Sequence, residues 1–367
     1  FYTLDHKTHT HMAAASPFFA TELAGVRLKK TKIEKDASAP LFEGTMEREG
    51  LAAYHTTILD MNIEVWYGPL AEVTFPTKFF DLTLETAKLL MSAYETNVLQ
   101  KKPLSEDQST RLKALEDGLQ AVIDQVRGKD ECVFVKTSCR SPKDTVVYSS
   151  RFKQLYREAL AKKEKKNEND KLAALLEAAI DLLKTFNAKE LLQIFTSSER
   201  IYQDMSVATS HPERFEQHFA IRQWVTVPPE MEFRGFYHNS KLNALSQYNH
   251  CCFYPRVAEH HKQIVERIQN FFYSQVEPKL KAAKIGACVV DFAITDENLE
   301  KIYVIELNPF VYTTDGCMFS WTHERQLLEN GPFEFRYQEK ERPGSLVAIA
   351  DAWRAIVEDE DAAIAKP

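Results

Sequence analysis

The sequence predicts an α+β protein, with helices and antiparallel hairpins mixed along the chain. Segments of helical periodicity and segments of strand alternation both occur, but without the regular strand–helix–strand order of an α/β protein. Two stretches, 219–249 and 287–307, each contain strand-like runs around a short polar turn, which indicates antiparallel pairing. The 367 residues, 44% of them hydrophobic and 27% charged, suffice for one large two-lobed unit or two to three small domains.

The N-terminal third is expected to begin with strands and continue with helices. Residues 62–82 hold two β-favouring runs broken by Gly68-Pro69 and by Pro76, which predicts a strand, a turn and a strand end. A helix is expected to follow through Tyr94. One face of a further helix, which Gly128 is well placed to terminate, is marked by Leu112, Leu115, Leu119, Ile123 and Val126.

The middle of the chain predicts a buried strand and then helices. The run ECVFVK (131–136) is typical of a buried strand, and the turn SCRSPKD follows it. A lysine- and glutamate-rich helix comes next, and its most polar part, 161–171, is expected to be a solvated face or a mobile insertion. A helical stripe that packs on the core is then predicted by Leu172, Leu175, Leu176, Leu182, Leu183 and Phe186.

The second half changes to strand periodicity. Residues 219–227 predict a strand that enters Pro228-Pro229, and Asn239-Ser240 predicts a hairpin turn between strands at 231–239 and 241–249. A helix is expected next, with Ile264, Ile268, Phe271 and Phe272 on one face. The last two strands are predicted at 287–294 and 301–307, on either side of the polar turn TDENLE.

Composition excludes several classes of protein. The formal net charge of −7 argues against non-specific binding to nucleic acid. The sequence contains no run of 18 apolar residues, so no membrane span is predicted. The six cysteines form no CxxC pair and are interpreted as thiols of a reducing compartment. Residues 1–11 are polar, carry three histidines and lack the apolar core of a signal peptide, so we expect a disordered leader or tag there. The expectation is a cytoplasmic monomer.

The most informative candidate site joins the last two strands. Asp291 and Glu306 each follow an apolar run, and antiparallel pairing would bring them to one end of the sheet, with Asn308 on the same face as Glu306. Two carboxylates and a carboxamide are hard oxygen ligands that suit magnesium held against nucleotide phosphates. The alternative is that acidic residues simply end these strands.

Candidate partners for phosphate are Lys136, Arg140, Lys143 and Arg234. Arg234 lies inside a predicted strand, where a charge is costly without an anionic partner, so an ion pair to Glu232 or Asp291 is the alternative. The sequence contains no GxxxxGK[ST], GxGxxG, GxSxG or HExxH pattern, which argues against P-loop, Rossmann, α/β-hydrolase and zinc-protease sites.

Five motifs, taken in order, resemble the cell division cycle protein 123 family, whose members have an ATP-grasp fold. The resemblance covers roughly residues 130–325. The motifs are FVKTSCRSPKD (134–144), LLQIFTSSERIYQDM (191–205), FAIRQWVTVPPEMEFRGFYHNSKLNALSQYN (219–249), VVDFAI (289–294) and IELNPFVYTTDGCMFSW (305–321).

The resemblance implies a domain order and a set of site residues. A first ATP-grasp lobe is expected at 129–227, with a helical insertion at about 151–187, and a second lobe at 228–345. An N-terminal region at 12–128 precedes them, and a C-terminal helix or tail at 346–367 follows. ATP would lie between the lobes. By resemblance, Lys136 and Arg234 would contact its phosphates. The turn that holds Ser138, Arg140, Ser141, Lys143 and Asp144 would close over the nucleotide. Adenine would lie beside Arg222, Gln223 and Trp224, and magnesium would be held by Asp291, Glu306 and Asn308.

The chain also departs from the family pattern. Glu306 stands where family members often have aspartate, a change that magnesium binding should survive. Tyr248 and Asn249 stand where the family tends to have Arg-Asp, which removes a charge near the expected site.

Two functions follow from the resemblance. Family members promote assembly of translation initiation factor 2 by binding its gamma subunit, so the first is an ATP-loaded assembly factor (a chaperone) with that subunit as its partner. The alternative is an ATP-grasp ligase that forms an acyl phosphate and couples it to an amine. A nucleotide-stabilised scaffold with neither activity is the third possibility. The sequence assigns no catalytic residue.

Overall fold

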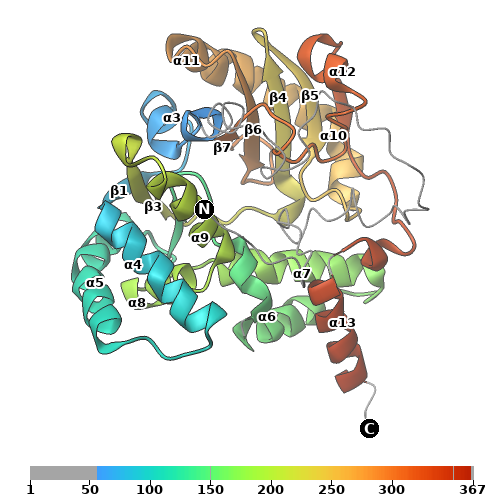
Figure 1. The fold of residues 1–367 in the computed structure, drawn as a ribbon. Helices are drawn as coiled ribbons and strands as arrows, with labels where there is room; N and C mark the ends of the chain where they lie inside the picture. The colour runs from blue at the N-terminus through green and yellow to red at the C-terminus, as the bar shows by residue number, and fades with distance from the viewer. Residues whose placement is uncertain (1–55, 149, 350, 365–367) are drawn as a thin grey trace, which may run out of the picture.

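The computed structural model describes residues 56–364 except 149 and 350, so the leader expected at 1–11 lies outside the described residues. The described chain contains a three-stranded sheet and a five-stranded sheet, each with helices packed against it. Figure 1 shows the five-stranded sheet in the upper lobe and the three-stranded sheet in the lower lobe. The predicted α+β class is therefore confirmed.

The first sheet has the order β1-β3-β2 and is antiparallel throughout. Its strands are β1 (Thr77–Leu82), β3 (Gln217–Gln223) and β2 (Val133–Thr137). Because β1 comes before residue 129, residues 77–126 of the expected N-terminal region pack with the first sheet. The helices that share a core with this sheet are α4 (Leu84–Tyr94), α5 (Glu106–Val126), α8 (Ala188–Phe195) and α9 (Glu199–Thr209).

The long helix α5 shows why the sequence folds this way. Ser105 and Gln108 form a reciprocal capping box at its start, which satisfies backbone N–H groups that have no partner within the helix. Four of the five apolar residues of the predicted stripe are buried and Leu115 is partly buried. The helix ends at Val126, two residues before Gly128.

Residues 63–70 were predicted as a strand, and that prediction is wrong: they form the helix α3 (Ile63–Leu70). Val65, Trp66 and Tyr67 favour strands locally, but Ile63, Trp66 and Leu70 lie at helical spacing and are fully buried in the main core. Burial of this face outweighs the weak local preference. The run before Pro76 forms turn and one isolated bridge at Thr74, and the strand β1 begins directly after Pro76, where the sequence predicts a strand end.

The second sheet has the order β7-β6-β4-β5-β8. All its pairs are antiparallel except β5 with β8, a parallel edge pair of three residues that the sequence did not predict. The predicted hairpin turn is present, with Asn239 and Ser240 both at positive φ, as a type I′ turn requires. Its strands are β4 (Glu232–His238), β5 (Lys241–Gln247), β6 (Ala287–Ile294), β7 (Ile302–Asn308) and β8 (Glu334–Arg336).

Helices and loops cover both faces of the second sheet. On one face, Ile264, Ile268 and Phe272 pack into the largest apolar core. On the other, Phe319, Trp321 and Leu328 pack against strand residues such as Phe236. The elements involved are α10 (Pro255–Phe271), η6 (Phe272–Val276), α11 (Glu277–Ala282) and α12 (Arg325–Asn330). The short helical turns elsewhere are η2 (Glu95–Leu99), η3 (Lys143–Tyr148), η4 (Pro212–Arg214), η5 (Pro229–Met231) and η7 (Ser345–Ala348).

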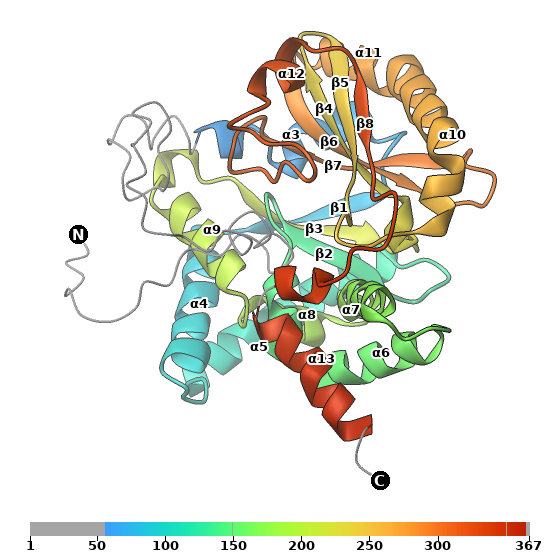
Figure 2. The ribbon, with the colours of Figure 1, turned by 90° about the vertical axis from the view of Figure 1, so that its right-hand side faces the viewer.

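The expected helical insertion is a pair of helices, α6 (Ser150–Ala161) and α7 (Glu168–Leu182), packed against one another. Figure 2 shows α13 (Asp351–Ile364) lying beside them. Phe152 of α6 meets Trp353 of α13 edge to face, and Arg157 pairs with Glu360. The C-terminal helix thus covers the insertion.

The polar segment 161–171 is more defined than the expected mobile insertion. Asn167 caps α7 through the backbone N–H of Asp170, and the Asp170 carboxylate accepts hydrogen bonds from the N–H groups of Lys165 and Lys166. Lys171 forms an ion pair with Asp361 of α13. These hydrogen bonds give partners to backbone N–H groups of the turn between the two helices, so the charged side chains of Asp170 and Lys171 stabilise local structure.

Within the described residues, no helix is long and apolar enough to cross a membrane. All six cysteines fall in the described part of the chain, and each is a free thiol.

Candidate functional site

The predicted acidic residues meet on neighbouring strands of the second sheet. Arg234 of β4 lies opposite Asp291 of β6, and Asp291 lies opposite Glu306 of β7. Asn308 follows two residues after Glu306, on the same strand. The predicted antiparallel pairing of Asp291 with Glu306 is therefore confirmed, and it places a cation and two carboxylates side by side.

Arg234 and Asp291 form a buried, two-pronged ion pair. Nε and one terminal nitrogen of Arg234 donate to the two oxygens of Asp291 at 2.8 and 2.7 Å, and the other terminal nitrogen donates to the carbonyl of Asp315. Asn308 Nδ2 also donates to Asp291, at 3.1 Å. Burial alone would lower the pKa of Arg234, but the charge of Asp291 overrides it and raises that pKa well above the ordinary value. The ion pair considered as an alternative at the sequence level is thus present.

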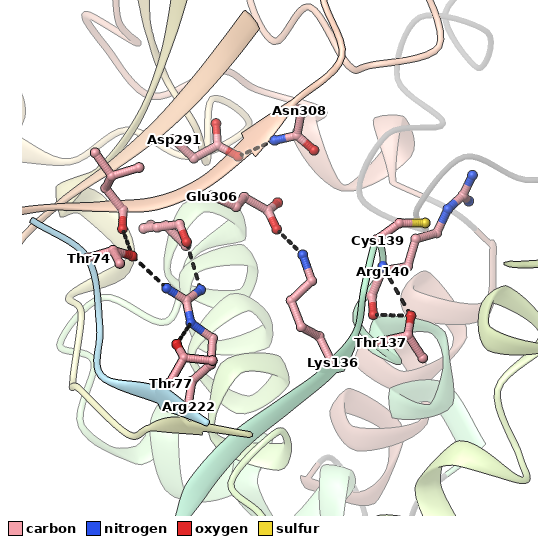
Figure 3. Close-up of polar contacts among 12 residues, drawn as sticks. Thr74, Thr77, Lys136, Thr137, Cys139, Arg140, Arg222, Asp291, Glu306 and Asn308 are labelled. Carbon is pink, nitrogen blue, oxygen red and sulfur yellow. Dashed lines mark hydrogen bonds and ion pairs between the residues drawn. The ribbon is translucent and has the colours of Figure 1, made fainter. Parts of the chain in front are cut away.

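Lys136 of the first lobe pairs with Glu306 of the second. The Lys136 Nζ lies 2.9 Å from Glu306 Oε2, and the lysine side chain is only 4% exposed. Figure 3 shows this contact reaching across from β2 to β7. Burial would raise the pKa of Glu306, but the charges of Lys136 and Lys143 hold it below its usual range. Glu306 is therefore ionised and is the anionic end of a bridge between the lobes.

Arg222 forms a second bridge, and it does so with its side chain. Its terminal nitrogens donate to the Ile305 carbonyl at 2.7 Å and to Thr74 Oγ1 at 2.8 Å, and Nε donates to Thr77 Oγ1 (Figure 3). Burial lowers its pKa to about 10. All the donors named here go to protein oxygens, so Arg222 links the two sheets directly.

The strand expected beside adenine lies in the middle of the first sheet. Arg222 pairs with Thr77 of β1 on one side and with Phe134 of β2 on the other. The N–H of Gln223 donates to the Pro76 carbonyl. The backbone of the ladder is thus engaged as far as Gln223, and only the chain from Trp224 onward leaves the sheet.

Trp224 is buried in a small cluster with Cys132 and Leu183, and the Lys184 ammonium lies 5.3 Å from its ring centroid. The structure thus assigns Trp224 a packing role.

The turn after β2 is fastened to α9. Arg140 Nε lies 2.9 Å from Asp204 Oδ1. Asp144 accepts from Ser198 Oγ at 2.6 Å and from the N–H of Arg200 at 3.2 Å, so it caps the start of α9.

Two serines belong to the same turn, and both are buried. Ser138 is fully buried, and its Oγ accepts from the His218 N–H. The Ser141 carbonyl accepts from the N–H of Lys143. Of the turn residues predicted to contact nucleotide, only Lys143 acts electrostatically on Glu306 and Glu232.

Two residues near the site, Tyr248 and Arg200, were not assigned a role from the sequence. The ring of Tyr248 lies against two cations, with Arg234 at 4.8 Å and Lys143 at 5.5 Å from its centroid. The backbone N–H of Arg200 donates to Asp144, which follows Lys143 in the chain. Glu232, the other ion-pair partner considered for Arg234, shares its strand face two residues away, but the bonds of Arg234 go to Asp291.

Glu232 has an unusual protonation state. Burial raises its pKa to about 7, with Asp291 and Glu306 adding to that shift and Lys143 opposing it. The carboxyl therefore carries a proton at mildly acidic pH, unlike Glu306.

The raised pKa of Glu232 predicts a pH dependence of stability. The folded protein holds this proton up to about pH 7, whereas the unfolded chain loses it near pH 4.5, so the stability associated with protonated Glu232 is fully present below pH 4.5 and is lost as pH rises through 7. We expect the stability of Glu232→Gln, relative to that of wild type, to increase between pH 5 and pH 8 by about 2–3 kcal/mol, because each pKa unit is worth about 1.4 kcal/mol. Urea unfolding at several pH values measures this, with exposed Glu266→Gln as the control. A constant difference between Glu232→Gln and wild type would contradict it.

The donor set fits a magnesium–nucleotide complex. Asp291 and Glu306 supply carboxylates, and Asn308 supplies an amide. The cations at the same site are Lys136, Lys143 and Arg234. In the described part of the chain, no group of three or more His, Cys, Asp or Glu side chains is placed to hold a metal ion. Magnesium is commonly bound by only one or two carboxylates together with phosphates and water, and this is the arrangement that these residues suit.

Part of the chain matches a known protein family and several curated proteins. Residues 173–352 match the D123 family model. The translation initiation factor eIF2 assembly protein of Candida albicans is 26% identical over 196 residues, which cover 48% of this chain and 56% of that protein. Its counterpart in Xenopus laevis is 25% identical over 167 residues, covering 44% and 48%. The chain thus spans about half the length of these curated relatives.

Two further likenesses extend beyond the family match. A putative CDC123-like protein of Acanthamoeba polyphaga mimivirus is 24% identical over 282 residues, covering 72% of this chain and 70% of that one. The structure of Cdc123 from Schizosaccharomyces pombe superimposes with a TM-score of 0.54 at 19% identity, over 78% of this chain and 98% of that one. The structural likeness shows that this chain shares the two-lobed fold of that protein, with which the expected ATP-grasp fold is consistent.

Proposed function

The chain belongs to the D123 family, and on that premise we propose that it is an ATP- and magnesium-binding assembly factor for translation initiation factor 2 that acts through the gamma subunit. The proposed partner comes from the names of the relatives, two of which are called eIF2 assembly proteins. The proposed ligand comes from the charged residues between the lobes.

The observation that carries the ATP proposal is the pairing of Lys136 with Glu306 and of Arg234 with Asp291. Burying four charges is costly unless each has a partner of opposite sign. A magnesium–nucleotide complex brings both signs, so phosphate oxygens could take over the cations while the metal takes over the carboxylates. No charge would then be left unpaired at any point of this exchange.

The same residues would couple the nucleotide to the arrangement of the lobes. Lys136 comes from the first sheet and Glu306 from the second, and Arg222 adds a direct link beside them. A ligand held by both Lys136 and Glu306 would bind best when the lobes keep this spacing. Its role in an assembly factor would be to fix the shape presented to the partner, for which turnover is not required.

A pulldown against the gamma subunit, beside an ADP-release assay, tests the proposal. We expect magnesium–ATP to strengthen binding of the full chain to the gamma subunit by about tenfold, which is typical of coupling between two sites. We expect little ADP release in the presence of pooled amino acids and peptides.

The alternative, a carboxylate–amine ligase, predicts the opposite result. A ligase must release ADP in step with product and only when its acceptor is present. Acceptor-dependent ADP release without binding to the gamma subunit would replace the assembly factor with the ligase.

A further inference from the structure

Arg200, on the first turn of α9, has buried donors without an acceptor. Its Nε and one terminal nitrogen are shielded from solvent and have no hydrogen-bond partner among the described residues. A guanidinium carries five N–H donors in a planar fork and stays charged at any physiological pH. Buried donors left unpaired cost free energy, so this arrangement favours an anion that supplies the missing acceptors.

The neighbouring acids are occupied and do not meet this need. Asp144 accepts from Ser198 Oγ and from the backbone N–H of Arg200, not from its guanidinium. Asp204 is held by Arg140 at 2.9 Å and by the Cys139 thiol at 3.1 Å. Both acids act on Arg200 only through space.

The surroundings of Arg200 disfavour its charge, chiefly because the guanidinium is buried. Burial, together with the nearby positive charge of Arg140, lowers the pKa of Arg200 despite the two acids. The guanidinium thus lies in surroundings that oppose its own charge. An incoming anion would relieve both the unpaired donors and this repulsion.

The position of Arg200 connects it with the nucleotide site. Its backbone N–H donates to Asp144 at 3.2 Å, and Asp144 directly follows Lys143, which together with Arg234 lies against the ring of Tyr248. Arg234 and Lys143 are the cations proposed above to meet phosphate, so Arg200 adds a third positive side chain from a different element, α9.

We infer that Arg200 is an oxyanion-recognition residue of the inter-lobe site and that it takes a phosphate group through its unpaired donors. The guanidinium fork matches two oxygens of one phosphate, and such charge-assisted pairs are among the strongest hydrogen bonds in proteins. The phosphate belongs either to the nucleotide, as its terminal group, or to a second phosphate-bearing ligand. The first source rests on the proposed function, whereas the second does not.

Calorimetric titration of the full chain separates these sources. If Arg200 meets the terminal phosphate, Arg200→Gln weakens magnesium–ATP by about 10- to 100-fold and leaves magnesium–ADP within about twofold. If Arg200 binds a second ligand, Arg200→Gln leaves the affinity for ATP unchanged. Pyrophosphate then binds to ATP-saturated wild type but not to the ATP-saturated Arg200→Gln variant. An Arg200→Gln variant with unchanged affinity for ATP and for pyrophosphate overturns the inference.

Two further measurements guard against a structural explanation. Without ligand, Arg200→Gln should melt at the same temperature as wild type or higher, because it removes an unpaired buried charge. A marked fall would show that Arg200 supports the fold, and the inference would be abandoned. Arg342→Gln, at an exposed arginine, is the matched control and should behave as wild type in every titration. Wild type that binds pyrophosphate but no ATP would refute the proposed function while leaving the Arg200 site intact.

Discussion

Replacing Asp291 by asparagine should destabilise the ligand-free protein by about 3–5 kcal/mol, the cost of leaving a buried charge without its partner. Arg234 is 4% exposed and Asp291 1% exposed in their side chains, and Asp291 accepts two of the guanidinium's donors. An asparagine keeps the shape but removes the negative charge that compensates the buried Arg234 guanidinium, which stays protonated. Urea unfolding of wild type and variant measures the effect.

A double variant shows whether the loss of stability arises from breaking the Arg234–Asp291 ion pair. Removing Arg234 as well, as Arg234→Met with Asp291→Asn, should recover most of the lost stability, because no unpaired charge remains. The double variant should nevertheless fail to gain stability from magnesium–ATP. Asp359→Asn, which breaks the exposed pair with Lys153, is the matched control and should cost about 0–1 kcal/mol. Purely additive effects of the two buried replacements would contradict this account.

The sequence was sufficient for the parts of the fold that local pattern determines. Asn239-Ser240 predicts the hairpin because both residues tolerate the positive φ of its turn. Asp291 and Glu306 are brought together because each ends an apolar run and the runs are joined by a short turn. The stripe from Leu112 to Val126 predicts α5 because helical spacing leaves one face to bury.

The parts that failed are those that depend on distant contacts. Residues 63–70 lack a decisive local signal, and only burial of Trp66 and its neighbours in the core makes them helical. β8 is three residues long and exists because β5 offers an edge. Nothing in a single sequence predicts such pairings.

In the candidate site, too, local pattern predicts some features, whereas others depend on contacts between distant residues. Lys136, Lys143, Arg234, Asp291, Glu306 and Asn308 were selected from the sequence and lie together in the structure. Their pairing was not predictable in full, because the Lys136–Glu306 contact joins residues 170 positions apart. Asp144 was expected over the nucleotide but caps α9, and Arg200 escaped notice because its defining property is a missing partner.

Lys136→Met should weaken magnesium–ATP by about 10- to 100-fold while changing the affinity for adenosine by less than about twofold. Lys136 is buried, points from β2 toward Glu306 and is a cation that the first lobe contributes to the site (Figure 3). A charge-assisted contact to phosphate contributes on the order of 1.5–3 kcal/mol, and adenosine offers no charge to receive it. Calorimetric titration with both ligands measures the difference.

The outcome decides whether Lys136 serves the ligand or only the fold. Methionine fills much of the same volume, and Glu306 is 23% exposed in its side chain, so water can partly solvate the carboxylate that loses its partner. We therefore expect the melting temperature of the ligand-free variant to fall by a few degrees at most. Exposed Lys88→Met is the control for the loss of one lysine charge. If ATP and adenosine lose affinity equally, or if the ligand-free variant unfolds, Lys136 is a structural residue and the phosphate assignment fails with it.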